Sequence, residues 1–318
     1  MAYTEGLYGK PQDPGATSKG ERDKEVEGKS PKDGLAARYM REIERYDSAT
    51  SEWHSEGADI EKLYLGEIEN SKDKRRLALL WTNVETLKPA VYPKAPTVQC
   101  SRRYKDRDKK ARTAAELMER ATNTSWDLYH ADETFRMVRD DRLLPGRGQG
   151  WVRYEATIEK YEEEVEELDP ETNEIVTRAI ERERVAAEKV CNDYVHWGDF
   201  GHNVSRTWQE VWLVWRIVYK RHDEVVERWG SEWASKLNYN SKSPNGSYST
   251  RTDNEDEDNR AKIYELWDKQ RNKTSWLAEG QKEFLESGPP PISFRDGFPC
   301  PEPCYATKST KSLVPRPD

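Results

Sequence analysis

The fold is decided by residues 140–158, which read DDRLLPGRGQGWVRYEATI. Upstream of this stretch apolar residues recur at helical spacing, whereas from Val152 to Ile158 apolar and polar residues alternate with a period of two. One proline and three glycines interrupt the chain between the two patterns. We therefore expect a helix over 133–143, a sharp turn at 146–150 and a half-buried strand that begins near Val152.

The residues around this turn are expected to divide between core and surface. Leu143 and Leu144 should be buried and should anchor the helix beside the strand at Val152 and Tyr154. Arg147 is expected to lie on the surface. Glycine suits the turn because such turns often need positive φ, which glycine adopts readily.

Residues 34–145 are predicted to be helical. The first helix begins near Asp33, and its apolar residues recur at helical spacing: Leu35, Tyr39, Ile43 and Tyr46. A later helix should stop near Lys88, because Pro89 lacks an N–H group and disfavours helical geometry in the residue before it. The next runs from about Asp106 to Tyr129. One of its faces is a narrow stripe of mainly small residues that would let another element approach closely: Ala111, Ala114, Met118, Ala121, Ser125 and Leu128.

Residues 146–288 are predicted to be rich in β-strands. The segment Ile175–Val195 is expected to form one or two strands with Val190 and Val195 in the core, and a helix over Ala179–Lys189 is the alternative. Both faces of 211–219 are apolar, which favours a central strand covered on both sides. The strands at 263–267 and 274–277 should form a hairpin. Asp223 is expected to cap a short helix that runs through Arg228 and ends at Gly230.

Helices come first along the chain and strands follow, so we expect an α+β fold with a mostly antiparallel β region rather than a parallel α/β sheet. The expected divisions are a flexible N-terminal tail at 1–33, a helical part at 34–145, a β-rich part at 146–288 with a flexible loop at 240–260, and an extended Pro-rich segment at 289–318.

The composition describes a folded protein with a small apolar core and much polar surface. Of the 318 residues 34% are hydrophobic and 35% charged, yet the 12 Trp and 16 Tyr argue against general disorder. The formal net charge of −8 is unlike that of a free-standing DNA-binding protein, which is usually basic. No apolar run approaches the roughly 20 residues that a membrane helix needs, and nothing resembles a secretory signal. The four cysteines are therefore expected to be reduced thiols.

The sequence offers little that predicts catalysis, and we expect a protein that is not an enzyme and uses no cofactor. A phosphate-binding loop at Gly146–Gly150 would need a strand before it and a helix after it, but the predicted order is reversed. The loose spacing of Cys300 and Cys304 does not favour a zinc site with His196 and His202. The acidic run at 162–167 is interpreted as a solvated face.

The residues singled out for contact with DNA or with another subunit are basic. Most lie in one dense segment, to which the arginine of the turn is added: Arg102, Arg103, Lys105, Arg107, Lys109, Lys110, Arg112 and Arg147. Seven cations in a row of eleven residues would make DNA binding strongly salt-dependent. Because Asp106 and Asp108 dilute the run, an intersubunit or solvent-facing role is favoured over direct DNA contact.

Several segments, in one order along the chain, resemble the portal proteins of short-tailed, podovirus-like bacteriophages. They are LWTNVETLKPAVY at 80–92, RYKDRD at 103–108, AAELMER at 114–120, DDRLLPGRG at 140–148, WVRYE at 151–155, DF at 199–200, WQEV at 208–211, ELWDK at 265–269 and FPCP at 298–301. No one of these motifs is specific, whereas the ordered set is fairly specific.

The resemblance implies a subunit of a ring, usually a homododecamer, at the unique capsid vertex of a virion assembled in the host cytoplasm. Such a ring conducts double-stranded DNA during packaging and ejection. Its implied partners are terminase, head–tail adaptor or tail proteins, and major capsid or scaffold proteins. The helices and sheets here would form the wing, and the chain stops about where the stem and clip of a portal should follow. The alternative is a phage DNA-binding or DNA-processing protein that uses the basic segment 102–112.

Overall fold

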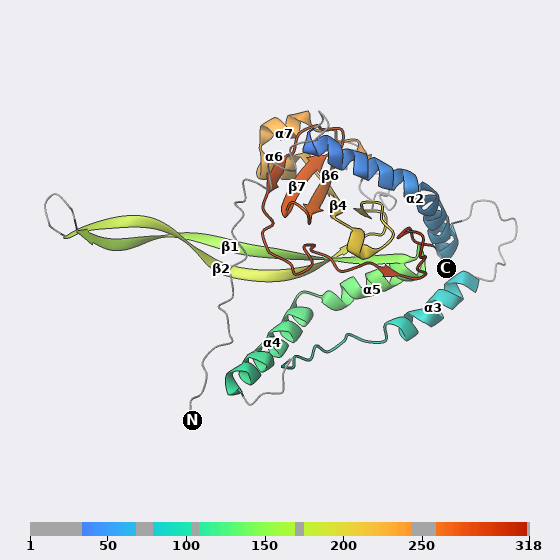
Figure 1. Ribbon diagram of the computed structural model, residues 1–318, viewed down its shortest axis with the longest axis horizontal. Helices are drawn as coiled ribbons and strands as arrows, with labels where there is room; N and C mark the ends of the chain where they lie inside the picture. The colour runs from blue at the N-terminus through green and yellow to red at the C-terminus, as the bar shows by residue number, and fades with distance from the viewer. Residues whose placement is uncertain (1–33, 68–78, 103–107, 169–174, 243–258, 317–318) are drawn as a thin grey trace, which may run out of the picture.

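The computed structural model describes residues 34–67, 79–102, 108–168, 175–242 and 259–316. It confirms an α+β protein, with helices in the N-terminal part followed by a mainly antiparallel β region. A long two-stranded arm and a separate helix, α4, extend from a body built on a sheet (Figure 1). The helices are α2 (Leu35–Leu65), α3 (Leu79–Val91), α4 (Lys109–Leu128), α5 (Ala131–Leu143), α6 (His222–Trp229) and α7 (Ser231–Lys236), with a short 3-10 helix η1 (Trp208–Glu210).

The strands form two antiparallel sheets. A six-stranded sheet has the order β3-β4-β6-β7-β8 with β5 paired to β6, and a three-stranded sheet has the order β2-β1-β9. The strands are β1 (Arg147–Leu168), β2 (Ile175–Val195), β3 (Phe200–His202), β4 (Leu213–Lys220), β5 (Ser241–Lys242), β6 (Asn259–Asp268), β7 (Lys273–Ala278), β8 (Glu286–Gly288) and β9 (Cys304–Tyr305). The predicted hairpin is confirmed as β6–β7, whose last pair is Asp268 with Lys273.

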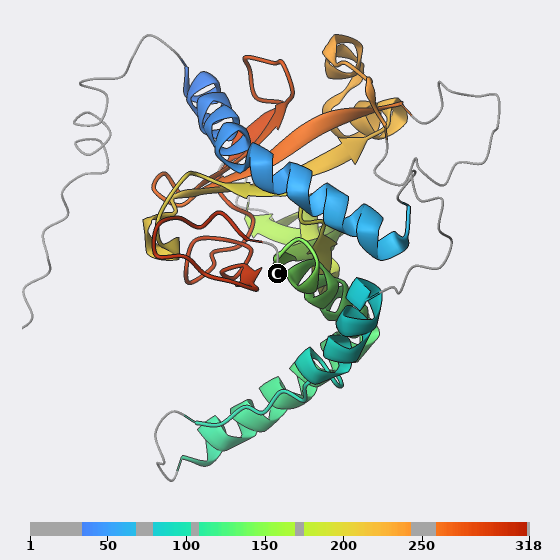
Figure 2. The ribbon, with the colours of Figure 1, turned by 90° about the vertical axis from the view of Figure 1, so that its right-hand side faces the viewer.

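The central strand β4 is covered on both faces, as expected. Leu213 and Trp215 point toward α2, which crosses the sheet (Figure 2), and pack against Tyr39, Ile43 and Tyr46. Val214 points to the other face and joins a cluster with Trp151, Phe298, Cys300 and Leu313. The Pro-rich segment 289–318 is therefore packed against the core in its described part, through residues that the sequence did not single out as buried.

Gly146 and Gly148 make the junction between α5 and β1 possible for different reasons. Gly146 has a φ of 90°, in the left-handed region that favours glycine. Gly148 already belongs to the strand, and a Cβ atom there would lie 1.9 Å from the backbone oxygen of Val138 in α5. The burial of Leu143 and Leu144 is confirmed, but their apolar cluster includes Val84 of α3 rather than the strand residues that we expected.

The arm is the most unusual element of the fold. Strands β1 and β2 pair from Gln149 with Val195 to Leu168 with Ile175, and the register shifts once, at a β-bulge between Thr157 and Ile158. The alternative helix over Ala179–Lys189 is thus wrong. The placement of Val190 in the core is also wrong, because this residue lies on the part of β2 that projects from the body and its side chain is exposed. Val195, at the body end of β2, is buried as expected.

Some helix boundaries also differ from expectation. Helix α3 continues through Pro89 to Val91, although Pro89 cannot donate a helical hydrogen bond and its ring crowds the carbonyl one turn earlier. The helical pattern resumes beyond it, since Tyr92 N donates to Lys88 O. The cap of α6 is Arg221 rather than Asp223, although Gly230 does end the helix. Helix α7 was not predicted. The tail 1–33 and most of the loop 240–260 lie outside the described residues.

We predict that Gly148→Ala destabilises the protein by about 1–3 kcal/mol or more, because an added methyl group would overlap the backbone of α5. The matched control is Gly150→Ala, where a Cβ meets no atom within 4 Å, so its effect should stay within about 0.5 kcal/mol. Thermal and urea unfolding of both variants would test this. Similar losses in the two variants would show that α5 does not press on the strand.

Candidate functional site at the root of the arm

Arg147, expected on the surface, is instead fully buried where α2, β1 and β3 meet. Its guanidinium donates to Tyr46 Oη, to the backbone oxygen of Trp197 at 2.6 Å and to that of Phe200 at 2.8 Å. The ring of Trp53 lies 4.5 Å from the guanidinium carbon and adds a cation–π contact. Arg147 therefore has no exposed surface in the described chain, and its contacts join elements of the core.

Asp141, near the end of α5, is a second buried polar group at this junction. Its carboxylate accepts hydrogen bonds from Tyr194 Oη at 2.7 Å and from the backbone N–H of Trp197 at 3.0 Å. Burial raises the pKa of Asp141 to about 7, although both hydrogen bonds and the charge of Arg147 act in the opposite direction. This carboxyl group thus ties α5 to the end of β2 and changes its charge near neutral pH.

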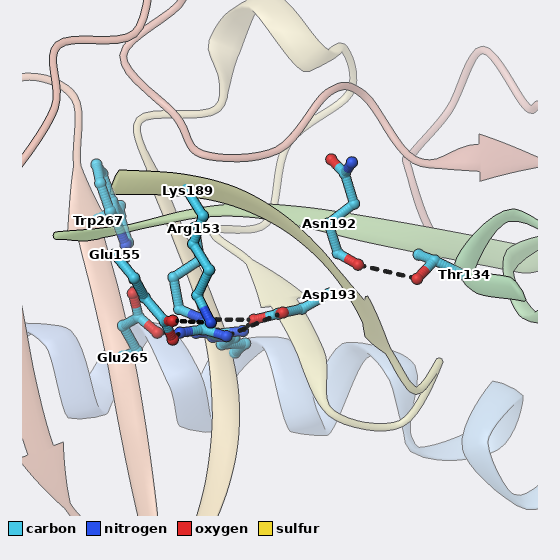
Figure 3. Close-up of polar contacts among 9 residues, drawn as sticks. Thr134, Arg153, Glu155, Lys189, Asn192, Asp193, Glu265 and Trp267 are labelled. Atoms are coloured by element: carbon cyan, nitrogen blue, oxygen red, sulfur yellow. Dashed lines mark hydrogen bonds and ion pairs between the residues drawn. The ribbon is translucent and has the colours of Figure 1, made fainter. Parts of the chain in front are cut away.

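The arm joins the sheet through a network of four charged side chains. Arg153 of β1 donates to Asp193 of β2 at 2.8 Å, and Arg216 of β4 donates to the same carboxylate at 3.0 Å and to Glu265 of β6 at 2.6 Å. Asp193 thus bridges two arginines from different sheets, and their hydrogen bonds lower its pKa despite the opposing effect of burial. Figure 3 shows how Arg153, Asp193 and Glu265 converge from separate strands.

Neighbouring contacts complete the root of the arm. Lys189 and Glu155 form an ion pair across the two strands (Figure 3). On the opposite face of the ribbon, Thr134 of α5 donates to the backbone oxygen of Asn192 at 2.9 Å (Figure 3). The arm is therefore held between α5 and the large sheet, and its direction relative to the body is set by directional contacts.

An open hollow of about 610 Å³ lies beside this root. Asp193, Asp199, Arg216 and Tyr219 are among its lining residues. Asp199 accepts a hydrogen bond from Tyr219 Oη at 3.1 Å, and burial raises the pKa of its carboxyl group. Each carboxylate is thus engaged by a neighbour, an arrangement that favours structural ionic contacts over acid–base chemistry.

Of the basic residues that the sequence analysis singled out, the structure keeps the described members of 102–112 together at the start of α4 and places Arg147 apart from them in the core. Lys109, Lys110 and Arg112 are exposed in the first turn of α4, while Arg102 donates to the backbone oxygen of Asp108 at 3.1 Å. The remaining three lie outside the described residues: Arg103, Lys105 and Arg107. The segment at 146–150 does follow a helix and enter a strand, the order that disfavoured a phosphate-binding loop.

The root network was missed by the sequence analysis, although one signal was present. Arg216 is a charged residue within the otherwise apolar strand at 213–219, and a buried charge requires partners. Nothing in the sequence identifies those partners, because Asp193 and Glu265 lie far away along the chain. As for metals, no group of three or more suitable ligands occurs among the residues that the structure describes, and Cys300 is buried while Cys304 is exposed.

Apolar side chains are exposed at two separate places: on α4 and on the distal arm, which is the part of the β1–β2 ribbon beyond the bulge between Thr157 and Ile158. Ile158 and Val185 face each other across the ribbon and are 57% and 55% exposed. Helix α4 has no buried residue, and its Leu117 and Met118 are 61% and 64% exposed. The stripe of small residues predicted to receive another element is therefore uncovered in the described chain.

We predict that Asp141→Asn changes how stability depends on pH. The folded pKa of about 7 lies above the ordinary value of 3.8, so the folded state holds more protons than the unfolded state between these two pH values. Its free energy of unfolding therefore falls as the pH rises, by up to about 1.4 kcal/mol per pH unit. An asparagine cannot titrate. The free energy of unfolding of the wild type relative to the variant should hence fall from pH 4 to pH 7 and then level off. If urea denaturation gave the same dependence of this free energy on pH for both proteins, the assignment would be wrong.

We also predict that Arg216→Met destabilises the fold by about 3–5 kcal/mol, because it leaves Glu265 buried without its cationic partner. The matched control is Arg184→Met, which removes an exposed ion pair with Glu159 on the arm and should cost no more than about 1 kcal/mol. The free energies of unfolding in urea provide the comparison. Equal losses would mean that the root network does not anchor the arm.

Comparison with known proteins assigns no family, since no protein-family model matches the chain and no curated protein is significantly similar to it. Within the described ranges, no helix is both long and apolar enough to cross a membrane. A functional conclusion therefore rests on the geometry of the arm, on its exposed surfaces and on the resemblance of the ordered sequence motifs.

Proposed function

We propose that this chain is a ring-forming subunit of a phage portal, with the described part acting as the wing at the capsid vertex. The observation that carries the proposal is the arm, in which two strands of 22 and 21 residues leave the body while exposing Ile158 and Val185. A two-stranded ribbon is marginally stable alone in water. An arm that is anchored by buried ionic contacts but exposes apolar side chains at Ile158 and Val185 fits a subunit that is completed by neighbours.

A ring also needs two different surfaces on each subunit, because a head-to-tail interface closes only when one patch meets another. The distal arm and α4 are two such patches, from different parts of the chain. Together with the ordered portal-like motifs, they support assembly around a channel for double-stranded DNA. Terminase, adaptor or tail proteins, and capsid or scaffold proteins are the partners that this proposal implies.

The distribution of charge agrees with a conduit better than with a DNA-binding protein. Residues 155–189 carry 13 acidic and five basic side chains, which equals the whole formal net charge of −8, and the rest of the chain holds 47 of each sign. A neutral body with an acidic arm would let DNA pass without strong attachment. The alternative function, DNA binding or processing, is supported by the exposed Lys109, Lys110 and Arg112.

We predict that the purified full chain assembles into closed rings. Sedimentation velocity over a range of concentrations, combined with negative-stain imaging, should show one large species with a central opening. DNA binding measured over a series of salt concentrations serves as the comparison. A protein that stays monomeric and binds DNA through Lys109, Lys110 and Arg112 would contradict the portal proposal and support the alternative.

A further inference from the structure

We infer that the distal arm of one copy lies along α4 of the next copy in the ring, with its acidic side chains beside Lys109 and Lys110 at the start of that helix. This inference rests on the proposed function and names the interface that would build the ring. Its occupant is a second copy of this chain, and three independent features support it: opposite charge, exposed apolar side chains and matching spacing.

The two surfaces carry opposite charge. By sequence, residues 155–189 have a formal charge of −8, whereas the start of α4 brings the exposed Lys109, Lys110 and Arg112 together. The cations of the arm with described side chains are already paired within it: Lys160, Arg182, Arg184 and Lys189. Lys109 and Lys110, by contrast, form no ion pair with any residue of the described ranges, so both surfaces retain charge for an external partner.

One face of the distal arm combines an apolar pair with an acidic pair. Beyond the bulge, Ile158 lies opposite Val185 and Glu162 lies opposite Glu181, and the alternation of side chains places all four on the same face. Two carboxylates directly opposite each other repel. The only described cation beside them is Lys160, whose Nζ lies 3.9 Å from Glu181, so this face favours a cationic partner.

Helix α4 presents the complementary pair of features. Lys110 and Leu117 are seven residues apart and therefore lie on one helical face, separated by about 10 Å along the axis. On the arm, the apolar pair and the acidic pair are four residues apart, about 13 Å. An apolar contact at Leu117 would thus bring the acidic pair close to Lys110, and exposed Ala114 lies between them.

The same chain does not supply this contact. Figure 1 shows α4 and the arm as separate projections from the body, with the distal ribbon away from the helix. The arm is also long enough for the role, because the 14 residues of β1 from Glu155 to Leu168 span about 46 Å and the 20 residues of α4 span about 30 Å. The arm is therefore long enough to lie along the whole of α4 in a neighbouring copy.

The first test reverses charge in the full-length protein. Lys109→Glu with Lys110→Glu, or Glu162→Lys with Glu181→Lys, should each weaken assembly at least about tenfold in sedimentation, as loss of central interface contacts does. The four substitutions together should restore assembly to within a few-fold of the wild type. The matched control combines Lys282→Glu and Lys311→Glu, two exposed positions outside both surfaces, and should assemble normally.

The second test joins the surfaces covalently. Leu117→Cys combined with Val185→Cys should give, on oxidation, a ladder of covalent oligomers that extends beyond the dimer, while either single variant gives none. The single variants also control for Cys100, Cys191 and Cys304, the natural cysteines with some exposure. Leu79→Cys combined with Val185→Cys serves as the geometric control, because Leu79 is exposed but lies on α3.

The outcomes separate this inference from the proposed function. Rings that form normally in the charge-reversed variants and give no ladder would overturn the inference and leave the portal proposal standing. A wild-type chain that remains monomeric at every concentration would overturn both. Loss of DNA binding without loss of assembly in the Lys109 and Lys110 variant would assign the basic segment to nucleic acid and also overturn the inference.

Discussion

The rest of the structure depends on the burial of one guanidinium group, that of Arg147. Removing an arginine from water is costly, and the described residues contain no carboxylate in an ion pair with it. Its hydrogen bonds go to Tyr46 and to the backbone at Trp197 and Phe200, while aromatic rings cover its faces. Because each acceptor belongs to a different segment, α2, the start of β1 and the start of β3 must all be in place before the guanidinium group has its hydrogen bonds.

The arm inherits its direction from this junction. Strand β1 begins at Arg147 itself, and a few residues later Arg153 and Asp193 connect the ribbon to Arg216 of the large sheet. Apolar contacts alone are tolerant of rotation, whereas charged hydrogen bonds have a preferred geometry. The transition from a packed root to a solvated ribbon occurs within about ten residues, and it marks where the contacts of a single chain end.

The sequence predicted the fold class and most element types, since strong periodicity identifies α2, α5, the central strand β4 and the β6–β7 hairpin. It failed where tertiary contacts override local pattern. Arg147 stands among glycines, which is typical of an exposed turn, and Val190 has the apolar character of a core residue although it lies on a ribbon with no layer to cover it. The ionic root could not be predicted, because its members come from four strands distant in sequence.

The length of the arm makes it a lever. Over about 46 Å of free ribbon, a rotation of only 5° at the root would displace the tip by about 4 Å, close to the 5.4 Å pitch of an α-helix. Small angular errors at the body would therefore become errors of almost one helical turn at any surface that the tip meets. The ionic contacts among Arg153, Asp193, Arg216 and Glu265 restrict this rotation at the root, where the displacement that it causes is smallest. The precision of contacts made far from the body is thus decided by side chains that never reach them.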